Sequence, residues 1–267
     1  MSDRVLITIN DGIADVRFNR ADKRNALDAE QFLAIAAAGE RLKSEPGVRV
    51  IVLSGEGASF CAGLDLSTMA VIADPSSGER SGNPGQLTEG GITHLGQQIC
   101  WVWQELAVPV IAAVHGHALG GGLQIALGAD IRFVHPTTQM SVREVYWGLV
   151  PDMTGTFTLS KLVRTDVAKE LTFTARVFSG TQAGEYGIAT HVTETPYEDA
   201  IVLAREIADR SPGAVRASKE LFNRMTTGGA AEQFAAERRL IGAQIGTPNQ
   251  KEAVVAGLEK RSPVFQD

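Results

Sequence analysis

The first residues alternate between apolar and polar side chains, a pattern typical of half-buried strands. The alternation runs over 4–10 and again over 13–18, with Asp11-Gly12 between the two stretches. Asp-Gly flanked by alternating sequence is a strong signal for a tight hairpin turn. The first elements are therefore predicted to be two paired strands.

Beyond this hairpin, helical periodicity alternates with short apolar runs. Asp28 is a suitable N-cap for a helix over 29–44, which Pro46-Gly47 would end. The segments 48–54 and 108–114 are apolar throughout and predict buried strands. Further strands are predicted over 131–134 and 139–142, and helices over 93–106 and within 116–130. Strands that alternate with helices over the first 150 residues predict an α/β fold.

From Thr158 onward the sequence is mostly helical in character. Helices are predicted over 166–174, 181–186, 198–211, 213–224, 230–245 and 249–260. We therefore divide the chain into an α/β core, residues 1–195, and a C-terminal helical region, residues 196–267. The helical region would either cap the core or build a subunit interface.

One internal segment differs in composition from the rest. Residues 74–91 are rich in glycine, proline, serine and charge. Such a segment is either a solvated loop or a lid over a substrate, because long loops inside compact domains are often functional. The sequence does not decide between these two interpretations.

Composition excludes several classes of protein. A chain of 267 residues with net charge −6 is a poor partner for nucleic acid or an anionic membrane surface. Two cysteines, Cys61 and Cys100, cannot build a disulfide framework. No apolar run reaches the ~18 residues of a spanning helix, and the N-terminal residues already resemble a strand rather than a leader. We expect a cytoplasmic protein.

Several common site motifs are absent from the sequence. There is no G-x-x-x-x-G-K-[ST] phosphate loop and no G-x-S-x-G nucleophile elbow. Gly55 and Gly57 begin a dinucleotide fingerprint, but Phe60 stands where its third glycine belongs. His115 and His117 are two residues apart, which does not suit a zinc pair. We predict no metal site and no tightly bound cofactor.

Two glycine-rich turns follow the two long apolar strands. The first is FCAGLDL at 60–66, and the second is HGHALGGG at 115–122, which opens a helix. Glycine permits close approach of a ligand, and the N–H groups at a helix start lack internal partners. Two such N–H groups directed at one carbonyl oxygen would make an oxyanion hole.

These turns also carry a family resemblance. FCAGLDL, PVIAAVHGHALGGG (109–122) and REVYWGLVPDMTG (143–155) resemble the enoyl-CoA hydratase/isomerase (crotonase) family, nearest its dienoyl-CoA isomerase branch. NRADKRNAL (19–27) resembles the family's adenine-side segment, with Ala21 in place of the usual proline, and LEKRSPVF (258–265) resembles its ending. The resemblance covers nearly the whole chain, in order.

The resemblance implies a fold, a substrate and an assembly. It implies a core of repeated ββα turns and a C-terminal helical region through which the protein assembles as a homotrimer or a hexamer. The substrate would be an acyl-CoA thioester, so coenzyme A enters as part of the substrate. The backbone N–H groups of Leu64 and Gly121 would form the oxyanion hole. The implied CoA-binding residues are Arg24, Ala26, Ala62, Asp65, Leu66 and Lys260, the last from a neighbouring subunit.

The candidate acid–base residues depart from the hydratase pattern. Gln124 stands where hydratases have glutamate, and an amide cannot take a proton near neutral pH. Glu144 occupies the family's second carboxylate position, and Asp152 follows eight residues later. Asp152 matches an acidic residue of the dienoyl-CoA isomerase branch and the nucleophile of the aroyl-CoA dehalogenase branch. Its alternative role is the N-cap of a following helix.

These residues favour an acyl-CoA double-bond isomerase, with Glu144 and Asp152 as proton carriers. The alternatives are a 2-enoyl-CoA hydratase, a nucleophilic Asp152, and an acyl-CoA-binding protein without turnover. Gln124 and Trp147 are expected to line the acyl pocket, with loops over 67–91. Three further expectations concern residues without a catalytic role. Cys61, in the first glycine-rich turn, is expected to be inert. Of Trp101 and Trp103, one should pack inward and the other toward a loop or a neighbour, and Arg216, Lys219 and Arg224 should form a solvated face.

Overall fold

The computed structural model describes residues 3–74, 86–210, 212–226, 230–261 and 263. Its larger sheet has six strands in the order β1-β2-β3-β4-β6-β9. The strands are β1 (Val5–Asn10), β2 (Ile13–Phe18), β3 (Val50–Gly55), β4 (Val110–Val114), β6 (Ile131–Val134) and β9 (His191–Val192). β1 and β2 form the predicted antiparallel hairpin, and every later pairing in this sheet is parallel.

A second, three-stranded sheet lies beyond the ends of the long strands. Its order is β5 (His117–Leu119), β7 (Gln139–Ser141) and β8 (Phe178–Ser179). β5 follows β4 after a turn at His115 and Gly116, so the chain leaves one sheet and enters the other at the second glycine-rich segment. This arrangement bears out the predicted α/β fold with repeated ββα turns.

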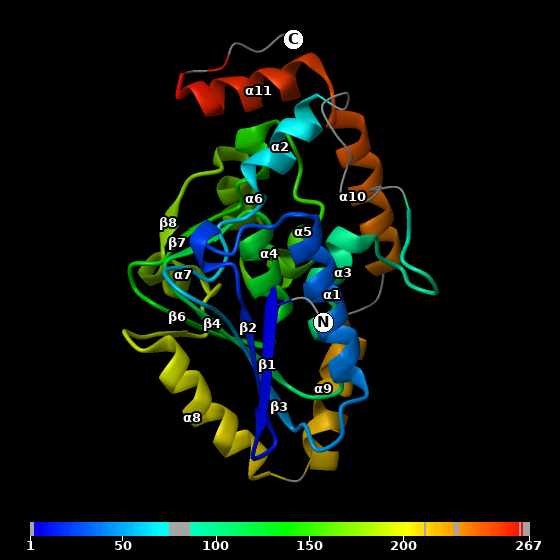
Figure 1. Ribbon diagram of the computed structural model, residues 1–267, viewed down its shortest axis with the longest axis vertical. Helices are drawn as coiled ribbons and strands as arrows, with labels where there is room; N and C mark the ends of the chain where they lie inside the picture. The colour runs from blue at the N-terminus through cyan, green and yellow to red at the C-terminus, as the bar shows by residue number, and fades with distance from the viewer. Residues whose placement is uncertain (1–2, 75–85, 211, 227–229, 262, 264–267) are drawn as a thin grey trace.

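The helices surround both sheets (Figure 1). They are α1 (Ala29–Lys43), α2 (Leu66–Ala73), α3 (Leu95–Glu105), α4 (Gly121–Gly128), α5 (Gly155–Leu162), α6 (Thr165–Thr174), α7 (Gly180–Tyr186), α8 (Pro196–Ala208), α9 (Pro212–Thr226), α10 (Ala230–Gln244) and α11 (Pro248–Glu259). The chain also forms the 3-10 helices η1 (Ala21–Lys23) and η3 (Glu144–Trp147). Most predicted helices are confirmed within a few residues at each end.

The long parallel strands are buried on both faces, as their apolar runs predict. Along β3, Ile51 and Leu53 pack in one hydrophobic cluster with α1, α3 and α4. Val50 and Val52 point to the other face and pack in a second cluster with α8. Successive side chains of a strand point to opposite faces, so each long strand needs a helical layer on both sides.

Helix α8 covers the sheet although it lies within the predicted C-terminal region. Its buried alanines, Ala200, Ala204 and Ala208, recur every four residues and pack against β2, β3, β4 and β6. Their small size lets the helix approach the sheet closely. The division of the chain at residue 195 stays a prediction.

Several local predictions are corrected by the structure. Residues 66–73, expected as loop, form α2, while 75–85 of the glycine-rich segment lie outside the described residues. Trp101 and Trp103 are both buried: Trp101 packs in a cluster with Phe157 and Phe234, and Trp103 lies in the main core. Both tryptophans can be buried because α3 is covered by other parts of the protein on more than one side.

The predicted solvated face on α9 is also wrong for Lys219. Its ammonium is buried and donates to the main-chain oxygens of Trp103 and Val108 and to Asp130 Oδ2 at 2.8–3.0 Å. Arg216 donates to the carbonyl of Val48, and the side chain of Arg224 lies outside the described residues. Within the described chain, the helices are too short or too polar to cross a membrane.

Candidate active site

Three chain segments lie side by side and form the floor of one cavity. The Cys61 N–H donates to His117 O at 2.9 Å, and the Leu119 N–H returns to Cys61 O at 3.2 Å, which joins the two glycine-rich turns. The segment around Leu27 joins the first turn on its other side, through the Leu27 N–H to Gly63 O and the Asp65 N–H to Leu27 O. Residues distant in sequence are thereby held in a fixed register.

Glycine is required at two of these crossings. Gly63 has a φ of +87°, and a Cβ there would lie 2.5 Å from Leu119 O. A Cβ on Gly122 would lie 2.2 Å from Cys61 O. Any side chain would separate the two turns, so the glycines of both motifs serve the close approach that the sequence predicts.

The cavity above this floor has a volume of about 580 Å³. Its walls are mostly apolar and come from α1, α2, η3, α10 and the segments before α3 and α5. Of the predicted site residues, the following line it: Ala26, Ala62, Leu64, Asp65, Leu66, Gly121, Glu144, Trp147 and Asp152. The structure therefore brings together both carboxyl groups and both predicted N–H donors.

The two N–H groups are well placed for binding an anionic oxygen. Gly121 is the first residue of α4, where a helical N–H has no internal acceptor and the helix dipole favours negative charge. Neither the Leu64 nor the Gly121 N–H donates to another main-chain oxygen among the described residues. Both residues line the same cavity, which fits the predicted oxyanion hole.

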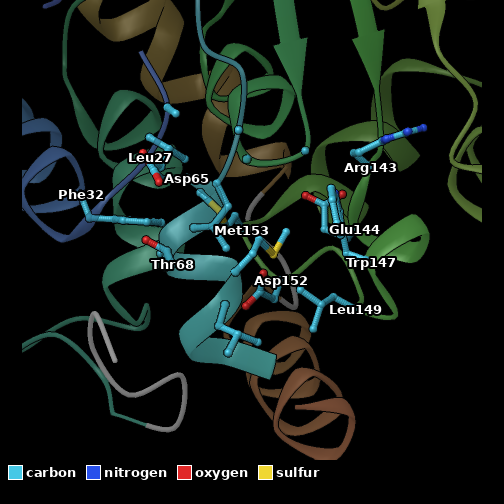
Figure 2. A pocket seen from close by; sticks show the side chains of 18 of the residues that line it. Leu27, Phe32, Asp65, Thr68, Arg143, Glu144, Trp147, Leu149, Asp152 and Met153 are labelled. Atoms are coloured by element: carbon cyan, nitrogen blue, oxygen red, sulfur yellow. The ribbon is translucent and has the colours of Figure 1, made fainter. Parts of the chain in front are cut away.

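Glu144 begins η3 and points into the cavity, as Figure 2 shows. It is 9% exposed, so it is not the surface residue that a Glu beside an Arg would suggest. Arg143 turns away, donating to Ala175 O at 2.9 Å and stacking 3.7 Å above the Tyr146 ring. The amide of Gln124 donates from Nε2 to Glu144 Oε1 at 2.6 Å.

Gln124 lies behind the cavity wall rather than in it, which corrects its predicted place in the acyl pocket. Its side chain is buried, and Oε1 accepts the N–H groups of Met153 at 3.0 Å and Gly155 at 2.8 Å. Since Oε1 receives two donors, Nε2 has to face Glu144. An amide that donates to a carboxylate favours its ionised form.

Asp152 lies in the segment between η3 and α5, and Figure 2 shows it near Met153 and Leu149 among the side chains that line the cavity. Its alternative role as a helix N-cap is wrong, because α5 begins after Thr154, whose φ is +69°. The side chain of Asp152 is 18% exposed, within the cavity. Asp152 is therefore part of the surface that a bound molecule would meet.

His94 is a cavity residue that the sequence analysis missed. It is the N-cap of α3, where Nδ1 accepts the Gly96 N–H at 3.0 Å, and it lines the cavity beside Asp152. Burial lowers the pKa of His94 to about 4, with the charge of Arg238 acting in the same direction. The N-cap position carried no recognisable signal, since histidine is not a preferred capping residue and Thr93 stands next to it.

Asp65 joins the cavity rim to the first helix. It is the N-cap of α2, and its carboxylate accepts from Ser67 and from Arg20 Nη1 at 2.6 Å. Arg20 also contacts Asp28, the N-cap of α1, at 3.1 Å. Burial alone would raise the pKa of Asp65, but the Ser67 and Arg20 hydrogen bonds outweigh it and lower the pKa to about 2.

Two predicted CoA contacts lie outside the cavity. Arg24 is exposed, and its carbonyl accepts the Ala62 N–H at 2.9 Å, so it supports the first turn through its main chain. Lys260 is the exposed C-cap of α11. Its contact with a neighbouring subunit stays a prediction.

The cysteine and histidine expectations are consistent with structural roles. Burial raises the pKa of the Cys61 thiol to about 12, so this side chain is a poor nucleophile. His117 Nδ1 lies 2.9 Å from Ser59 Oγ, and His115 Nε2 lies 2.9 Å from Gly57 O. Among the described residues, no cluster of histidine, cysteine and acidic side chains is suited to a metal.

The fold and this cavity define an enzyme of the acyl-CoA-processing class, and the comparisons identify the family. The family model described as enoyl-CoA hydratase/isomerase matches residues 8–267. The chain belongs to the enoyl-CoA hydratase/isomerase family, also called the crotonase family.

Named relatives and solved structures agree with this assignment. The chain is 33% identical to mouse "Enoyl-CoA hydratase domain-containing protein 2, mitochondrial" (96% of this chain, 85% of that one) and 33% identical to mouse "Methylglutaconyl-CoA hydratase, mitochondrial" (96% and 80%). A carnitinyl-CoA dehydratase from Mycobacterium avium superposes with a TM-score of 0.84 at 28% identity, covering 99% of both chains. A putative enoyl-CoA hydratase/isomerase from Acinetobacter baumannii gives 0.84 at 27% identity, covering 96% and 99%.

Proposed function

We propose that this enzyme moves double bonds within an enoyl- or dienoyl-CoA thioester. The observation that carries the proposal is that the hydrogen bonds of the Gln124 side chain are already used within the protein. Its oxygen accepts two main-chain N–H groups and its NH₂ group donates to Glu144. The residue therefore offers no proton acceptor for activating water, and the carboxyl group proposed to act with Glu144 is that of Asp152, which also lines the cavity.

The proposed reaction uses each group once. Glu144, ionised, takes a proton from C2 of a 3,5-dienoyl-CoA, and the electron pair delocalises onto the thioester oxygen. The Leu64 and Gly121 N–H groups stabilise that oxygen, a contribution of roughly 3–4 kcal/mol per donor. Asp152, protonated, delivers a proton at C6, which gives the 2,4-dienoyl product. Proton exchange with solvent restores both carboxyl groups.

Hydration is the second candidate function, because one of the named relatives is a methylglutaconyl-CoA hydratase and another is named for an enoyl-CoA hydratase domain. In that reaction Asp152 would replace the carboxylate absent at Gln124 and help Glu144 to hold a water molecule. Isomerisation is the better supported of the two, because it needs only proton transfer between carbons and leaves Gln124 in its observed role.

An absorbance assay separates these reactions. We expect the purified protein to convert a 3,5-dienoyl-CoA to its conjugated 2,4 isomer, and Glu144→Gln to lower kcat by roughly 10²–10⁴-fold. Glu198→Gln is the matched control, since Glu198 is exposed on α8 away from the cavity. Hydration of crotonyl-CoA without isomerisation would contradict the proposal and favour a hydratase. No turnover of either substrate, with tight acyl-CoA binding, would favour a binding protein.

The proposed assembly is a homotrimer or hexamer built through the C-terminal helices. Leu221 and Phe222 on α9 are 65% and 71% exposed in the single chain. Adjacent large apolar side chains on a surface favour a protein interface. Sedimentation of the wild type against Phe222→Glu tests this, and an unchanged oligomer would contradict a role for α9.

A further inference from the structure

One peptide group in the cavity wall is held at both of its polar ends. It joins Asp152 to Met153. Its carbonyl oxygen, that of Asp152, lies 3.2 Å from His94 Nε2, and its N–H, that of Met153, donates to Gln124 Oε1 at 3.0 Å. The peptide plane is therefore fixed from α3 on one side and from α4 on the other.

The tautomer of His94 follows from its two partners. The Gly96 N–H can only donate, so Nδ1 accepts, and the Asp152 carbonyl can only accept, so Nε2 carries the proton. Both hydrogen bonds are satisfied by neutral imidazole alone. The side chain is 7% exposed, which leaves it little freedom to adopt another orientation.

We propose that His94 is a positioning residue that directs the Asp152 carboxylate toward the substrate by holding the Asp152 main-chain carbonyl. This inference rests on the proposed function, in which Asp152 carries a proton. Gln124 contributes from the other side, and because it also holds Glu144, the two side chains together set the separation of the two carboxyl groups.

His94 is not itself placed as a proton carrier. Its Nε2 lies 4.0 Å from Asp152 Oδ2, beyond hydrogen-bond distance, and its proton is used on the carbonyl. Burial keeps the pKa of the imidazole near 4, the charge of Arg238 acts in the same direction, and the hydrogen bond to the Asp152 carbonyl acts against both. His94 therefore stays neutral through an assay range of about pH 6 to 8.

Two substitutions separate the capping role of His94 from its positioning role. In His94→Asn, the side-chain oxygen can accept the Gly96 N–H in place of Nδ1, and asparagine is a good N-cap, but the side chain is too short to reach Asp152. In His94→Gln, the amide nitrogen stands near the place of Nε2 and can donate to the carbonyl, while the cap is lost.

The positioning role predicts opposite effects on activity and stability. We expect kcat to fall roughly 10–100-fold in His94→Asn, with KM within about twofold and Tm nearly unchanged. We expect His94→Gln to recover most of that kcat while its Tm falls by roughly 2–4 °C. A purely structural role would make activity follow Tm, with His94→Gln the less active variant, and that order would overturn the proposal.

Three further measurements test whether His94 acts through Asp152. In a protein that already carries Asp152→Asn, adding His94→Asn should lower kcat little further, because the carboxylate that His94 positions is gone. If the double variant instead showed the product of the two separate losses of kcat, the proposal would be overturned. A fall of kcat below about pH 6–7 that is present in the wild type and absent in His94→Asn would overturn it as well. Amide hydrogen exchange over residues 150–155 should quicken in His94→Asn and not in His94→Gln.

Different results would contradict the positioning role of His94 and the proposed isomerase function. If the wild type hydrates crotonyl-CoA and does not isomerise, the isomerase proposal fails, and the same order of variants is expected for hydration. If the wild type turns over neither substrate, the hydrogen-exchange comparison decides. Equal exchange in both variants would then overturn the positioning role.

Discussion

The Gln124 amide donates to the Glu144 carboxylate across 2.6 Å, with both side chains buried. This contact replaces a possible pair of carboxylates by one carboxylate and one amide. It fixes the direction of Glu144, and the bonds from Met153 and Gly155 fix the amide in turn. Substitutions at and around Gln124 therefore test the acid–base arrangement directly.

Gln124→Glu would place two buried carboxyl groups within hydrogen-bond distance. Two such groups cannot both ionise readily, so the pair has to keep one proton. Holding that proton in the folded state raises stability at low pH and lowers it as pH increases. We expect the free energy of unfolding to be close to that of the wild type at pH 5.5 and lower by about 1–2 kcal/mol at pH 8.5.

Urea unfolding of both proteins at the two pH values measures this difference. The same variant should isomerise more slowly at pH 8.5 and gain hydration of crotonyl-CoA, because a second carboxylate becomes available to hold water. A stability difference that does not change with pH would show that the two carboxyl groups are not in contact.

Gly155→Ala tests the same contact without changing any charge. A Cβ at Gly155 would lie 2.6 Å from Gln124 Oε1, so the amide would have to move. Overpacking of this kind costs typically 1–3 kcal/mol, and we expect kcat to fall because Glu144 loses its fixed partner. Thermal unfolding and the isomerisation assay measure the two effects.

Gly242→Ala is the control for this substitution. Gly242 lies within α10, and nothing stands within 4 Å of its added Cβ. Alanine there should stabilise the helix by about 0.5–1 kcal/mol. Equal effects at the two positions would contradict the close packing of Gly155 on Gln124.

The sequence predicts best those features whose cause is local. The hairpin follows from alternation and Asp11-Gly12, and the Asp28 cap of α1 follows from side-chain chemistry, with Oδ1 accepting the Gln31 N–H at 2.9 Å. The glycine-rich turns that carry Leu64 and Gly121 are also local. Helix α2 was missed because its sequence, LSTMAVIA, is apolar on most sides and lacks a polar face.

The features that the sequence does not predict depend on contacts between distant segments. His94 is 58 residues from Asp152, and neither its position nor its neighbours indicates a cavity residue. Lys219 sits at a spacing from Arg216 that suggests an exposed charged face, yet its acceptors lie 89–116 residues away. The position of Gln124 behind the pocket wall is another such feature, because the sequence alone cannot show which side of a helix faces a cavity.

Asp65 should make the wild type sensitive to acid. Its pKa in the folded protein is lowered to about 2, below the ordinary value of 3.8, so the ionised form is favoured by folding. The stabilisation is present above about pH 4 and is lost as pH falls toward 2. Asp65→Asn keeps the N-cap and removes the charge, and we expect it to cost about 1 kcal/mol at pH 7 after allowance for solvent screening.

The decisive measurement is the stability difference between wild type and Asp65→Asn at pH 7, 4 and 2.5. It should shrink toward zero at the lowest pH, where the wild-type carboxylate begins to be protonated as well. Asp22→Asn, at an exposed carboxylate on η1, should show no such trend. A difference that is constant with pH would mean that the Arg20 contact does not depend on the charge of Asp65.

Lys219 provides the last prediction, which concerns the link between α9 and the core. Its ammonium satisfies two main-chain carbonyls and the Asp130 carboxylate at 2.8–3.0 Å, and the residue is 8% exposed. Lys219→Met keeps the apolar stem but leaves these acceptors without their common donor. Removing one partner of a buried pair typically lowers the free energy of unfolding by 3–5 kcal/mol, and because Asp130 is 24% exposed we expect a loss of about 3 kcal/mol.

Lys251→Met, at an exposed lysine of α11, is the control and should change the free energy of unfolding by less than about 0.5 kcal/mol. Chemical unfolding of the two variants measures the contrast. A loss for Lys219→Met as small as that for Lys251→Met would mean that water reaches the Lys219 site and replaces the ammonium.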